Sequence, residues 1–279
     1  MSERGSEASA PGDAVDRTVD PAEVARYRRL AAMWWQAEGP MWPLHVLNGL
    51  RRDWIRDRLC AELARDPPRA RPLAGLDVLD IGCGGGLLSE AMARMGARVH
   101  GVDVVERNVA IAREHAAGTG LAIDYECTSA GRLAARRADY DVVLNMEVIE
   151  HVADPGAFMD AVNALVRPGG HGFVSTLNRN TISFLVGIVG AEYVFRVLPR
   201  GTHRWRRFVR PDELAGHLAR GGLAVRARTG VKVNPVTRRM WLSPSTSVNY
   251  MVLARRGARN RDPAGATPPA ARRRWSGTA

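Results

Sequence analysis

Short apolar runs alternate with amphipathic helical stretches through the middle of the chain. Strand-like apolar runs cover residues 76–82, 98–104, 122–128, 140–146 and 172–177. Segments with helical spacing separate them, at residues 86–96, 106–118 and 155–170. Near-continuous apolar strands that alternate with helices are typical of a parallel sheet covered on both faces. The pattern therefore predicts an α/β fold.

The segments on either side extend this prediction. Helical spacing covers residues 22–35 and 48–66 before the first strand, which predicts a helical lid over residues 21–75. After the fifth strand, the pattern predicts helices at 181–198 and 211–222 and strands near 223–231 and 248–256. Together these give seven strands, most of them parallel, in one domain of residues 21–256.

The two ends of the chain differ from the middle in composition. Residues 1–20 and 257–279 are rich in Ala, Gly, Pro, Ser and charged residues, so we expect disordered tails there. Residues 1–20 also lack the apolar core of a signal peptide. No run reaches the roughly 18 apolar residues that span a bilayer.

Charge is distributed unevenly. The formal net charge is +11, yet residues 21–192 carry 19 Arg against 21 acidic residues. The excess lies in residues 193–232, with nine Arg and Lys232 against two acids, and in the C-terminal tail. A basic protein of this kind raises nucleic acid or an anionic membrane as a partner. The sequence has no aromatic-rich RNA motif, which disfavours nucleic acid.

The three cysteines, Cys60, Cys83 and Cys127, are isolated, with no CxxC pair. A disulfide framework or a zinc site is therefore not expected, and a reducing cytoplasm fits this pattern.

A glycine-rich loop follows the first strand, in the stretch Asp80-Ile81-Gly82-Cys83-Gly84-Gly85-Gly86. Glycines at Gly82, Gly84 and Gly86 allow a sharp turn and close approach of a ligand. The dinucleotide spacing GxGxxG would need a third glycine where this chain has Leu87. GxGxG preceded by an acid is instead typical of methyltransferases that use S-adenosylmethionine (SAM), whose sulfonium cation favours a nearby carboxylate. A glycine turn without a ligand is the remaining alternative.

A second acidic residue, Asp103, ends the next predicted strand. A carboxylate there can accept hydrogen bonds from both ribose hydroxyls of an adenosine.

A third group of polar residues follows the strand at 140–146. Glu147, Glu150 and His151 share one face if this turn is helical, and their ligand types suit Mg²⁺. The alternative is a solvated loop without metal. The stretch from Asn145 to Val148 lacks the Asn/Asp-Pro-Pro-aromatic signature of nucleobase methylation.

Several longer stretches identify the chain by resemblance. They lie at residues 34–51, 79–97, 146–155, 168–180, 189–203 and 248–251, and include WWQAEGPMWPLHVLNGLR and PGGHGFVSTLNRN. The chain resembles the ubiquinone biosynthesis O-methyltransferase family of class I SAM-dependent methyltransferases. The resemblance implies a Rossmann-like sheet and O-methylation of polyprenylated catechols at both methylation steps of the pathway.

The same resemblance implies site residues. For SAM it implies Arg51, Gly82, Asp103 and Met146, in addition to the loop residues above; for magnesium it implies Glu147, Glu150 and His151. The chain departs from the family at Met41-Trp42, where Phe-Lys is usual, and at Gly49, where Pro is usual. The first departure lies in the predicted lid, so substrate preference could differ.

The expected reaction is an in-line transfer from sulfonium to a catechol oxygen, with Mg²⁺ held by Glu147, Glu150 and His151 stabilising the phenolate. His45 is a candidate proton acceptor, with packing in the lid as the alternative. Trp34, Trp35 and Trp42 are interpreted as core or lid packing rather than substrate stacking. Another aromatic or polyketide substrate is the alternative function.

Residues 181–210 join an apolar stretch to five arginines and Trp205. This combination is typical of a helix lying at an anionic membrane surface, although a buried helix with a solvated basic loop has the same pattern. We therefore expect a cytoplasmic protein that is peripheral on the inner face of the cell membrane. A complex of quinone-biosynthesis enzymes is a further expected partner.

Overall fold

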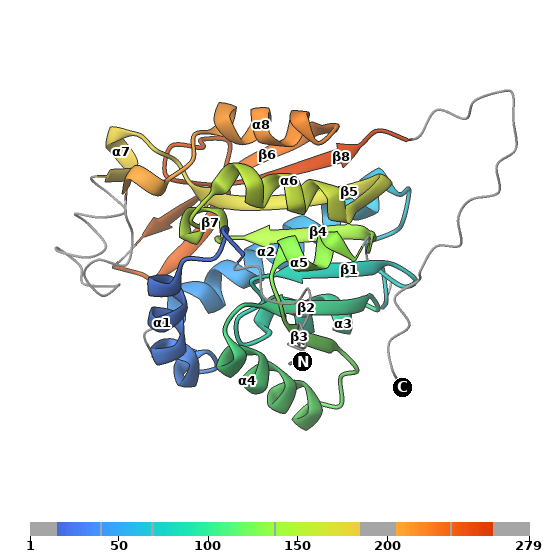
Figure 1. Cartoon of the computed structure of the whole chain (residues 1–279), viewed down its shortest axis with the longest axis vertical. Helices are drawn as coiled ribbons and strands as arrows, with labels where there is room; N and C mark the ends of the chain where they lie inside the picture. Colours follow the sequence, from blue (N-terminus) through green and yellow to red (C-terminus); the bar gives the residue numbers. More distant parts are fainter. Residues whose placement is uncertain are drawn as a thin grey trace, which may run out of the picture.

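A twisted sheet of eight strands forms the centre of the molecule (Figure 1). The computed structural model describes residues 16–39, 41–67, 70–136, 138–184, 205–234 and 236–258. The strand order is β3-β2-β1-β4-β5-β8-β6-β7. The strands are β1 Asp77–Ile81, β2 Arg98–Asp103, β3 Asp124–Cys127, β4 Tyr140–Met146, β5 Val166–Leu177, β6 Leu223–Asn234, β7 Arg239–Ser243 and β8 Asn249–Arg256.

Strands β1 to β5 pair in parallel, whereas β8, β6 and β7 continue the sheet with antiparallel pairings. The α/β prediction with a mostly parallel sheet is confirmed. The sheet has eight strands where the sequence predicted seven, because β7 folds back on β6. The Asn234 side chain accepts from the backbone N–H groups of Val236 and Thr237, and this turn starts the hairpin.

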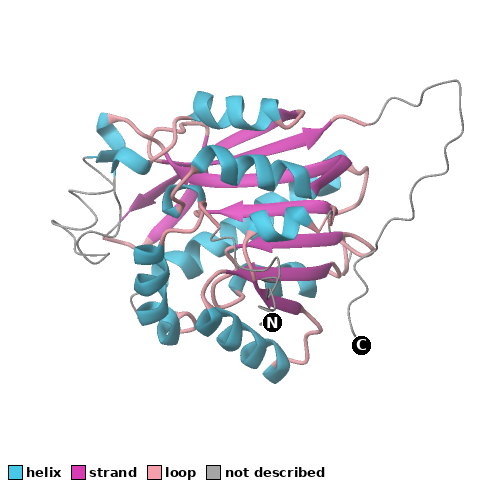
Figure 2. Cartoon of the chain, in the orientation of Figure 1, coloured by secondary structure: helices cyan, strands magenta, loops and turns pink. Residues whose placement is uncertain are grey.

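Helices cover both faces of the sheet (Figure 2). The described helices are α1 Pro21–Leu30, η1 Ala31–Met33, α2 Trp42–Glu62, α3 Leu87–Arg94, α4 Glu106–Gly118, α5 Ala130–Ala135, η2 Ile149–His151, α6 Pro155–Leu165, α7 Thr181–Ser183, η4 Trp205–Arg207 and α8 Pro211–Arg220. Two of them begin with an aspartate cap followed by proline. Asp20 accepts from Ala22 N–H at α1, and Asp154 accepts from Ala157 N–H at α6.

Two large hydrophobic clusters, one on each face of the sheet, form most of the described core, and a third, smaller one lies between α4, β3 and the glycine loop. The first places α5, α6 and α8 against residues such as Val143 and Val174. The second places α2 and α3 against residues such as Val142 and Phe173. Successive residues of β4 therefore point to opposite clusters, which explains why this strand is apolar almost throughout.

Some predicted boundaries differ from the structure. Helix α2 begins at Trp42 rather than at residue 48, because Pro43 is favourable in a first helical turn. Helix α6 ends at Leu165, and the stretch to Gly170 belongs to β5, because Pro168 and Gly169 do not support a helix.

The N-terminal tail prediction needs a correction at its boundary. Residues 16–20 contact the rest of the domain: Asp16 accepts a hydrogen bond from Ser129, and the Thr18 carbonyl accepts from Ala153 N–H. Residues 1–15 and 259–279 lie outside the described residues, as does 185–204, the larger part of the expected membrane-facing segment.

Helix α1 lies at the carboxyl ends of the parallel strands, towards which the arrowheads of β1 and β4 point (Figure 1). In open α/β sheets this edge is where ligands bind. Among the helices that the structure describes, none is both long and apolar enough to cross a membrane.

Candidate active site

A pocket opens at the carboxyl ends of β1, β2 and β4. Asp80, Gly82, Asp103 and Met146 line it from the sheet, and we call these residues the strand half of the pocket. Glu23, Tyr27, Trp34 and Arg51 line it from α1, the turn after η1, and α2, and we call these the lid half. The pocket therefore lies between the sheet edge and the N-terminal helices.

The glycine loop connects β1 to α3 in a left-handed backbone conformation. The φ angles of Gly82, Gly84 and Gly86 are 69°, 55° and 87°, a region that favours glycine. Gly82 lines the pocket. Gly84 contributes its N–H to Asp103, and Gly86 caps α3. The loop predicted from the GxGxG spacing is thus formed. Of its glycines, one lines the pocket, one donates a hydrogen bond to Asp103, and one caps α3.

Asp103 fixes the loop through two hydrogen bonds. Its two carboxylate oxygens accept from Gly84 N–H at 2.9 Å and from Val105 N–H at 2.8 Å. Burial raises the pKa of Asp103, and these hydrogen bonds act in the opposite direction. The side chain is 8% exposed and faces the pocket, where a ribose would bind.

Asp80 lies beneath the loop at the end of β1. Its carboxylate accepts from Ser89 Oγ at 2.6 Å. Burial raises its pKa to about 6, with the neighbouring Asp103 adding to this effect. A buried carboxylate of this kind gains most from a cationic ligand.

The lining of the pocket is acidic although the whole chain is basic. Among the described residues that line it are five acids, Asp20, Glu23, Asp80, Asp103 and Glu147, and one arginine, Arg51. An acidic cavity fits the sulfonium cation of SAM and opposes the diphosphate of a dinucleotide. The residues therefore fit the cofactor that the glycine spacing predicted.

Arg51 is the cation that can hold an anionic part of the ligand. It is 4% exposed, and its Nη2 atom lies 3.0 Å from Glu147 Oε1. Its Nε atom is buried without a hydrogen-bond partner among the described residues. A ligand carboxylate, such as that of the SAM methionine, would satisfy this donor.

Glu147 leaves strand β4 in an unusual conformation. Its φ angle is 59°, which is uncommon for a residue with a Cβ atom. The backbone N–H donates to the Ser175 carbonyl, and Oε1 accepts from Asn249 Nδ2 at 2.6 Å. The side chain is thus held between Arg51 and Asn249.

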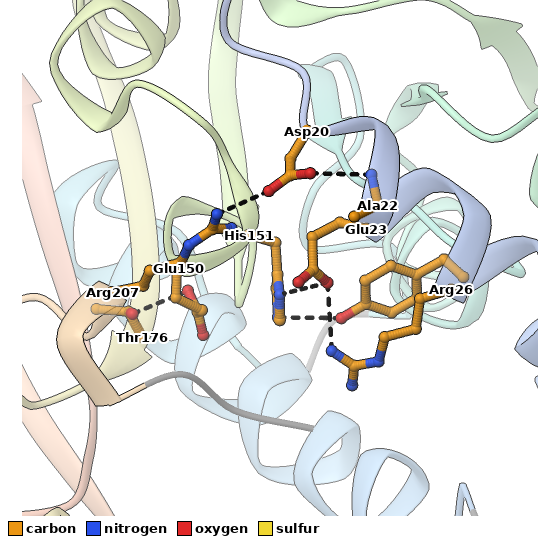
Figure 3. Close-up of polar contacts among 9 residues, drawn as sticks. Asp20, Ala22, Glu23, Arg26, Glu150, His151, Thr176 and Arg207 are labelled. Atoms are coloured by element: carbon orange, nitrogen blue, oxygen red, sulfur yellow. Dashed lines mark hydrogen bonds and ion pairs between the residues drawn. The ribbon is translucent and has the colours of Figure 1, made fainter. Parts of the chain in front are cut away.

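Glu150 points to a different partner. Its Oε2 atom accepts from Thr176 Oγ1 at 2.9 Å (Figure 3). Burial raises the pKa of Glu150 to about 8, and the Glu147 carboxylate adds to this effect. Burial beside a second carboxylate therefore favours the protonated form of Glu150.

His151 contacts the lid rather than either glutamate of its own segment. Its Nδ1 atom lies 3.2 Å from Glu23 Oε2 (Figure 3). Its Nε2 atom lies 3.0 Å from the Tyr27 hydroxyl. The hydrogen bond with His151 holds the pKa of Glu23 below its ordinary value.

The expected magnesium face is not formed. Glu147 has a left-handed backbone and only residues 149–151 form a 3-10 turn, so the α-helical spacing that would align the three side chains is missing. Within the described ranges, no group of three Asp, Glu, His or Cys side chains could hold a metal ion. The three residues as placed do not fit a preformed magnesium site.

His45 has a hydrogen-bond partner within the lid. Its Nε2–H donates to the Trp34 carbonyl at 2.9 Å, and its ring meets Trp35 edge-on. His45 does not line the pocket. These contacts favour the packing interpretation over the proton-acceptor role.

Sequence reasoning missed Glu23, Tyr27 and Asn249 as site residues, as well as Asn108, which also lines the pocket. Tyr27 and His151 are 124 residues apart in the chain, and no local spacing connects them. The one signal available was an acidic residue in the first turn of a capped helix, which usually indicates a favourable helix dipole interaction.

Comparison with known proteins agrees with this geometry. A family model described as "Methyltransferase domain" matches residues 51–228. A magnesium protoporphyrin IX methyltransferase from Synechocystis, solved with bound S-adenosylhomocysteine (SAH), superposes with a TM-score of 0.53 at 18% identity, covering 83% of this chain and 99% of that one. A [4+2]-cyclase superposes with a TM-score of 0.51 at 18% identity, covering 74% of this chain and 81% of that one. Fold alone therefore leaves the reaction open.

The fold, the acidic glycine-loop pocket and the matched domain define a class I SAM-dependent methyltransferase. Relatives narrow this further. Ubiquinone biosynthesis O-methyltransferases from Brucella anthropi and Rhodopseudomonas palustris are 50% and 49% identical, covering 86% and 90% of this chain and 97% and 98% of their own. The chain belongs to the ubiquinone biosynthesis O-methyltransferase family, and its cofactor is SAM.

Proposed function

We propose that the protein transfers a methyl group from SAM to a catechol hydroxyl of polyprenylated intermediates in ubiquinone biosynthesis, at both O-methylation steps. The relatives carry this name at about 50% identity over nearly their whole length. The observation that carries the proposal is the acidic pocket at the carboxyl edge of the sheet, which suits a sulfonium donor.

The strand half and Arg51 position the donor in this proposal. Asp103 would accept hydrogen bonds from the ribose hydroxyls of SAM, and the Arg51 guanidinium would bind the carboxylate of its methionine part. Transfer from a sulfonium is an in-line displacement, so the acceptor oxygen must approach the methyl group from the side opposite sulfur. With the donor held at the strand ends, that approach comes from the lid half.

In this proposal the hydroxyl group of the catechol substrate binds to His151 Nε2, where the Tyr27 hydroxyl lies in the structure. Tyr27 is itself a phenol, and it contacts His151 Nε2 at 3.0 Å. Glu23 at Nδ1 holds the imidazole with Nε2 directed towards the hydroxyl. His151 then accepts the phenolic proton as the oxygen attacks, and Glu147 lines the same pocket.

One assay tests this proposal. Labelled SAM and a short-chain demethylubiquinol are incubated with the protein, with Mg²⁺ or with a chelator. We expect one methyl group per acceptor on a catechol oxygen, and no product from an acceptor with both hydroxyls already methylated. If other catechols react and the demethylubiquinol does not, the alternative of another aromatic or polyketide substrate is correct.

We also propose that the protein acts as a cytoplasmic enzyme, peripheral on the inner face of the cell membrane, because a polyprenyl substrate resides in the bilayer. The described ends of residues 181–210 support this. Ile182 and Phe184 are 54% and 41% exposed, Phe184 meets Trp205 edge-on, and Arg206 is exposed beside them. Exposed apolar and basic groups together favour an anionic interface.

Vesicle co-sedimentation tests the membrane contact. Binding should increase with the anionic lipid fraction and decrease with salt. Equal sedimentation with neutral and anionic vesicles at every salt concentration would contradict it. When the protein is bound to membranes, we further expect chemical cross-links to other quinone-biosynthesis enzymes. If none form, the expected complex is wrong and only the membrane contact stands.

A further inference from the structure

Two adjacent tryptophans of the lid lie on the glycine loop. Trp34 and Trp35 follow η1 and form what we call the tryptophan pair. The Trp35 indole N–H donates to the Gly85 carbonyl at 2.9 Å, and the Trp34 indole N–H donates to Asn108 Oδ1 at 2.9 Å. The pair therefore connects the lid to the loop and to the start of α4.

The Trp34 ring covers the loop backbone closely. A Cβ atom added at Gly84 would lie 2.6 Å from the Trp34 ring, and one added at Gly85 would lie 2.5 Å from Trp34 Cβ. Trp34 lines the cofactor pocket, whereas Gly84 and Gly85 beneath it do not. The ring thus occupies the space through which a ligand would approach these two glycines.

Gly85 shows that the loop is shaped for this ring. Its φ angle lies outside the left-handed region that the other loop glycines adopt, so the backbone does not demand glycine there. All three of the nearest atoms to an added Cβ belong to Trp34. The small residue at this position is therefore explained by the tryptophan.

Further contacts hold the pair in place. Trp35 stacks on His115 with ring centroids 3.3 Å apart, and His115 contacts the buried Glu90 at 2.5 Å. His45 donates to the Trp34 carbonyl. Asn108, which accepts from Trp34, is 1% exposed. These contacts join the tryptophan pair to α3 and α4 and also to the start of α2 within the lid.

We propose that the tryptophan pair retains the cofactor: Trp34 covers the glycine-loop side of the pocket, and the pair must leave the loop before SAM enters or SAH departs. The geometry supports this because the same ring borders the pocket and the loop. The proposal deepens the proposed function and depends on it only through the cofactor.

Binding measurements without acceptor test the proposal. Calorimetry gives the Kd for SAM and SAH, and stopped-flow fluorescence gives the SAH dissociation rate. For Trp34→Ala we expect the dissociation rate to rise about 10-fold or more and the Kd to rise with it. Trp34→Phe, which removes the Asn108 hydrogen bond and keeps a ring, should show a smaller increase. Trp241→Phe, on the exposed side of β7, is the matched control and should stay within about twofold of the parent.

Gly85→Ala tests whether the contact itself matters. The added methyl group should displace Trp34 and accelerate SAH dissociation, and the same change in the Trp34→Ala background should add nothing. Unchanged dissociation in both single variants, or effects that multiply independently in the double variant, would overturn the proposal. If Trp34→Ala does not fold, the SAH dissociation rates of Trp34→Phe and Gly85→Ala test the same proposal.

These outcomes are separate from the acceptor assignment. Normal SAH retention by Trp34→Ala with full methylation of demethylubiquinol would overturn the tryptophan proposal and leave the proposed function standing. If Trp34→Ala releases SAH rapidly but the parent protein methylates no quinone precursor, the tryptophan proposal stands and the proposed function is overturned.

Discussion

The strand half and the lid half of the pocket are assembled by different means. Each residue of the strand half is one of the last two residues of a strand or directly follows one, so the parallel sheet aligns them at one edge. The lid half is held by contacts between distant parts of the chain, such as Glu23 with His151 and Arg51 with Glu147. The strand half is rigid because the sheet is rigid, whereas the lid half depends on a few side-chain contacts.

This difference separates two tasks. Donor binding needs groups that keep their positions through the catalytic cycle, and buried strand ends provide them. Acceptor binding needs a site that can open to a bulky substrate, and helices joined by side-chain contacts allow that. Variants of the strand half should therefore impair donor binding, and variants of Glu23 and Tyr27 should impair acceptor turnover, whereas Arg51 and Trp34 are lid residues that also contact the donor side.

The largest effect is expected for Asp103→Asn in the strand half. Asparagine keeps only one accepting oxygen, so it cannot accept from both Gly84 N–H and Val105 N–H and it loses the charged ribose acceptor; the Kd for SAM should rise about 100-fold. Calorimetry measures this, with Asp160→Asn, an exposed residue of α6, as the control. A Kd within threefold of the parent would contradict the assigned role.

Glu23→Gln in the lid half should impair turnover and spare donor binding. His151 loses its charged partner, so kcat should fall about 10- to 100-fold, while the Kd for SAM changes less than threefold. Methyl transfer at saturating SAM measures this, and Glu38→Gln, an exposed lid residue, is the control. A variant that loses SAM affinity and keeps kcat would show that the two halves are not separate.

Glu150→Gln should change how stability depends on pH. The native pKa of Glu150 is about 8, above the ordinary value of 4.5, so its stabilising contribution is complete below about pH 4.5 and is lost as the pH rises towards 8. The Tm of Glu150→Gln should therefore exceed that of the parent by a margin that grows to several degrees across this range. Thermal melts from pH 5 to 8 measure the margin, with Glu114→Gln as the exposed control. A margin independent of pH would refute the raised pKa.

Asp20 combines a helix cap with an ion pair, and two variants separate them. Asn also caps helices, so Asp20→Asn should lose only the contact with Arg207 at 2.7 Å, at about 0.5–1 kcal/mol of unfolding free energy. Asp20→Ala should cost about 1 kcal/mol more. Urea unfolding measures both. In the Arg207→Gln background, the Asp20→Asn loss should disappear; its persistence would show that the ion pair contributes nothing.

The smallest effect is expected from metal removal. The strand half has no metal ligand set within the described residues, so a chelator should change the Kd for SAM by less than about twofold. Calorimetry with and without Mg²⁺ measures this in the absence of acceptor. A large increase in affinity on adding Mg²⁺ would show that a cation joins the two halves.

The sequence located most of the strand half but little of the lid half. Asp80 and Asp103 followed from the strand pattern, which fixes where each strand ends, and from the glycine spacing, which locates the turn between; Met146 and Arg51 were named only through the family resemblance. His151 was predicted as a site residue, but it was expected beside Glu147 and Glu150 on one helical face. That face depended on backbone angles that Glu147 does not adopt. Glu23 had no local signal, since its partner is brought near only when α1 packs across the sheet edge.

By itself, the sequence determined the α/β layers, the glycine turn, the cofactor class and the family, because all of these depend on local periodicity and on motifs a few residues long. Only the tertiary structure decided that a strongly basic chain has an acidic pocket, that Glu23 and Tyr27 contact His151, and that Trp34 covers the glycine loop. Such contacts arise when buried helices and strands pack together, and no spacing along the chain encodes the distance between two residues on different elements.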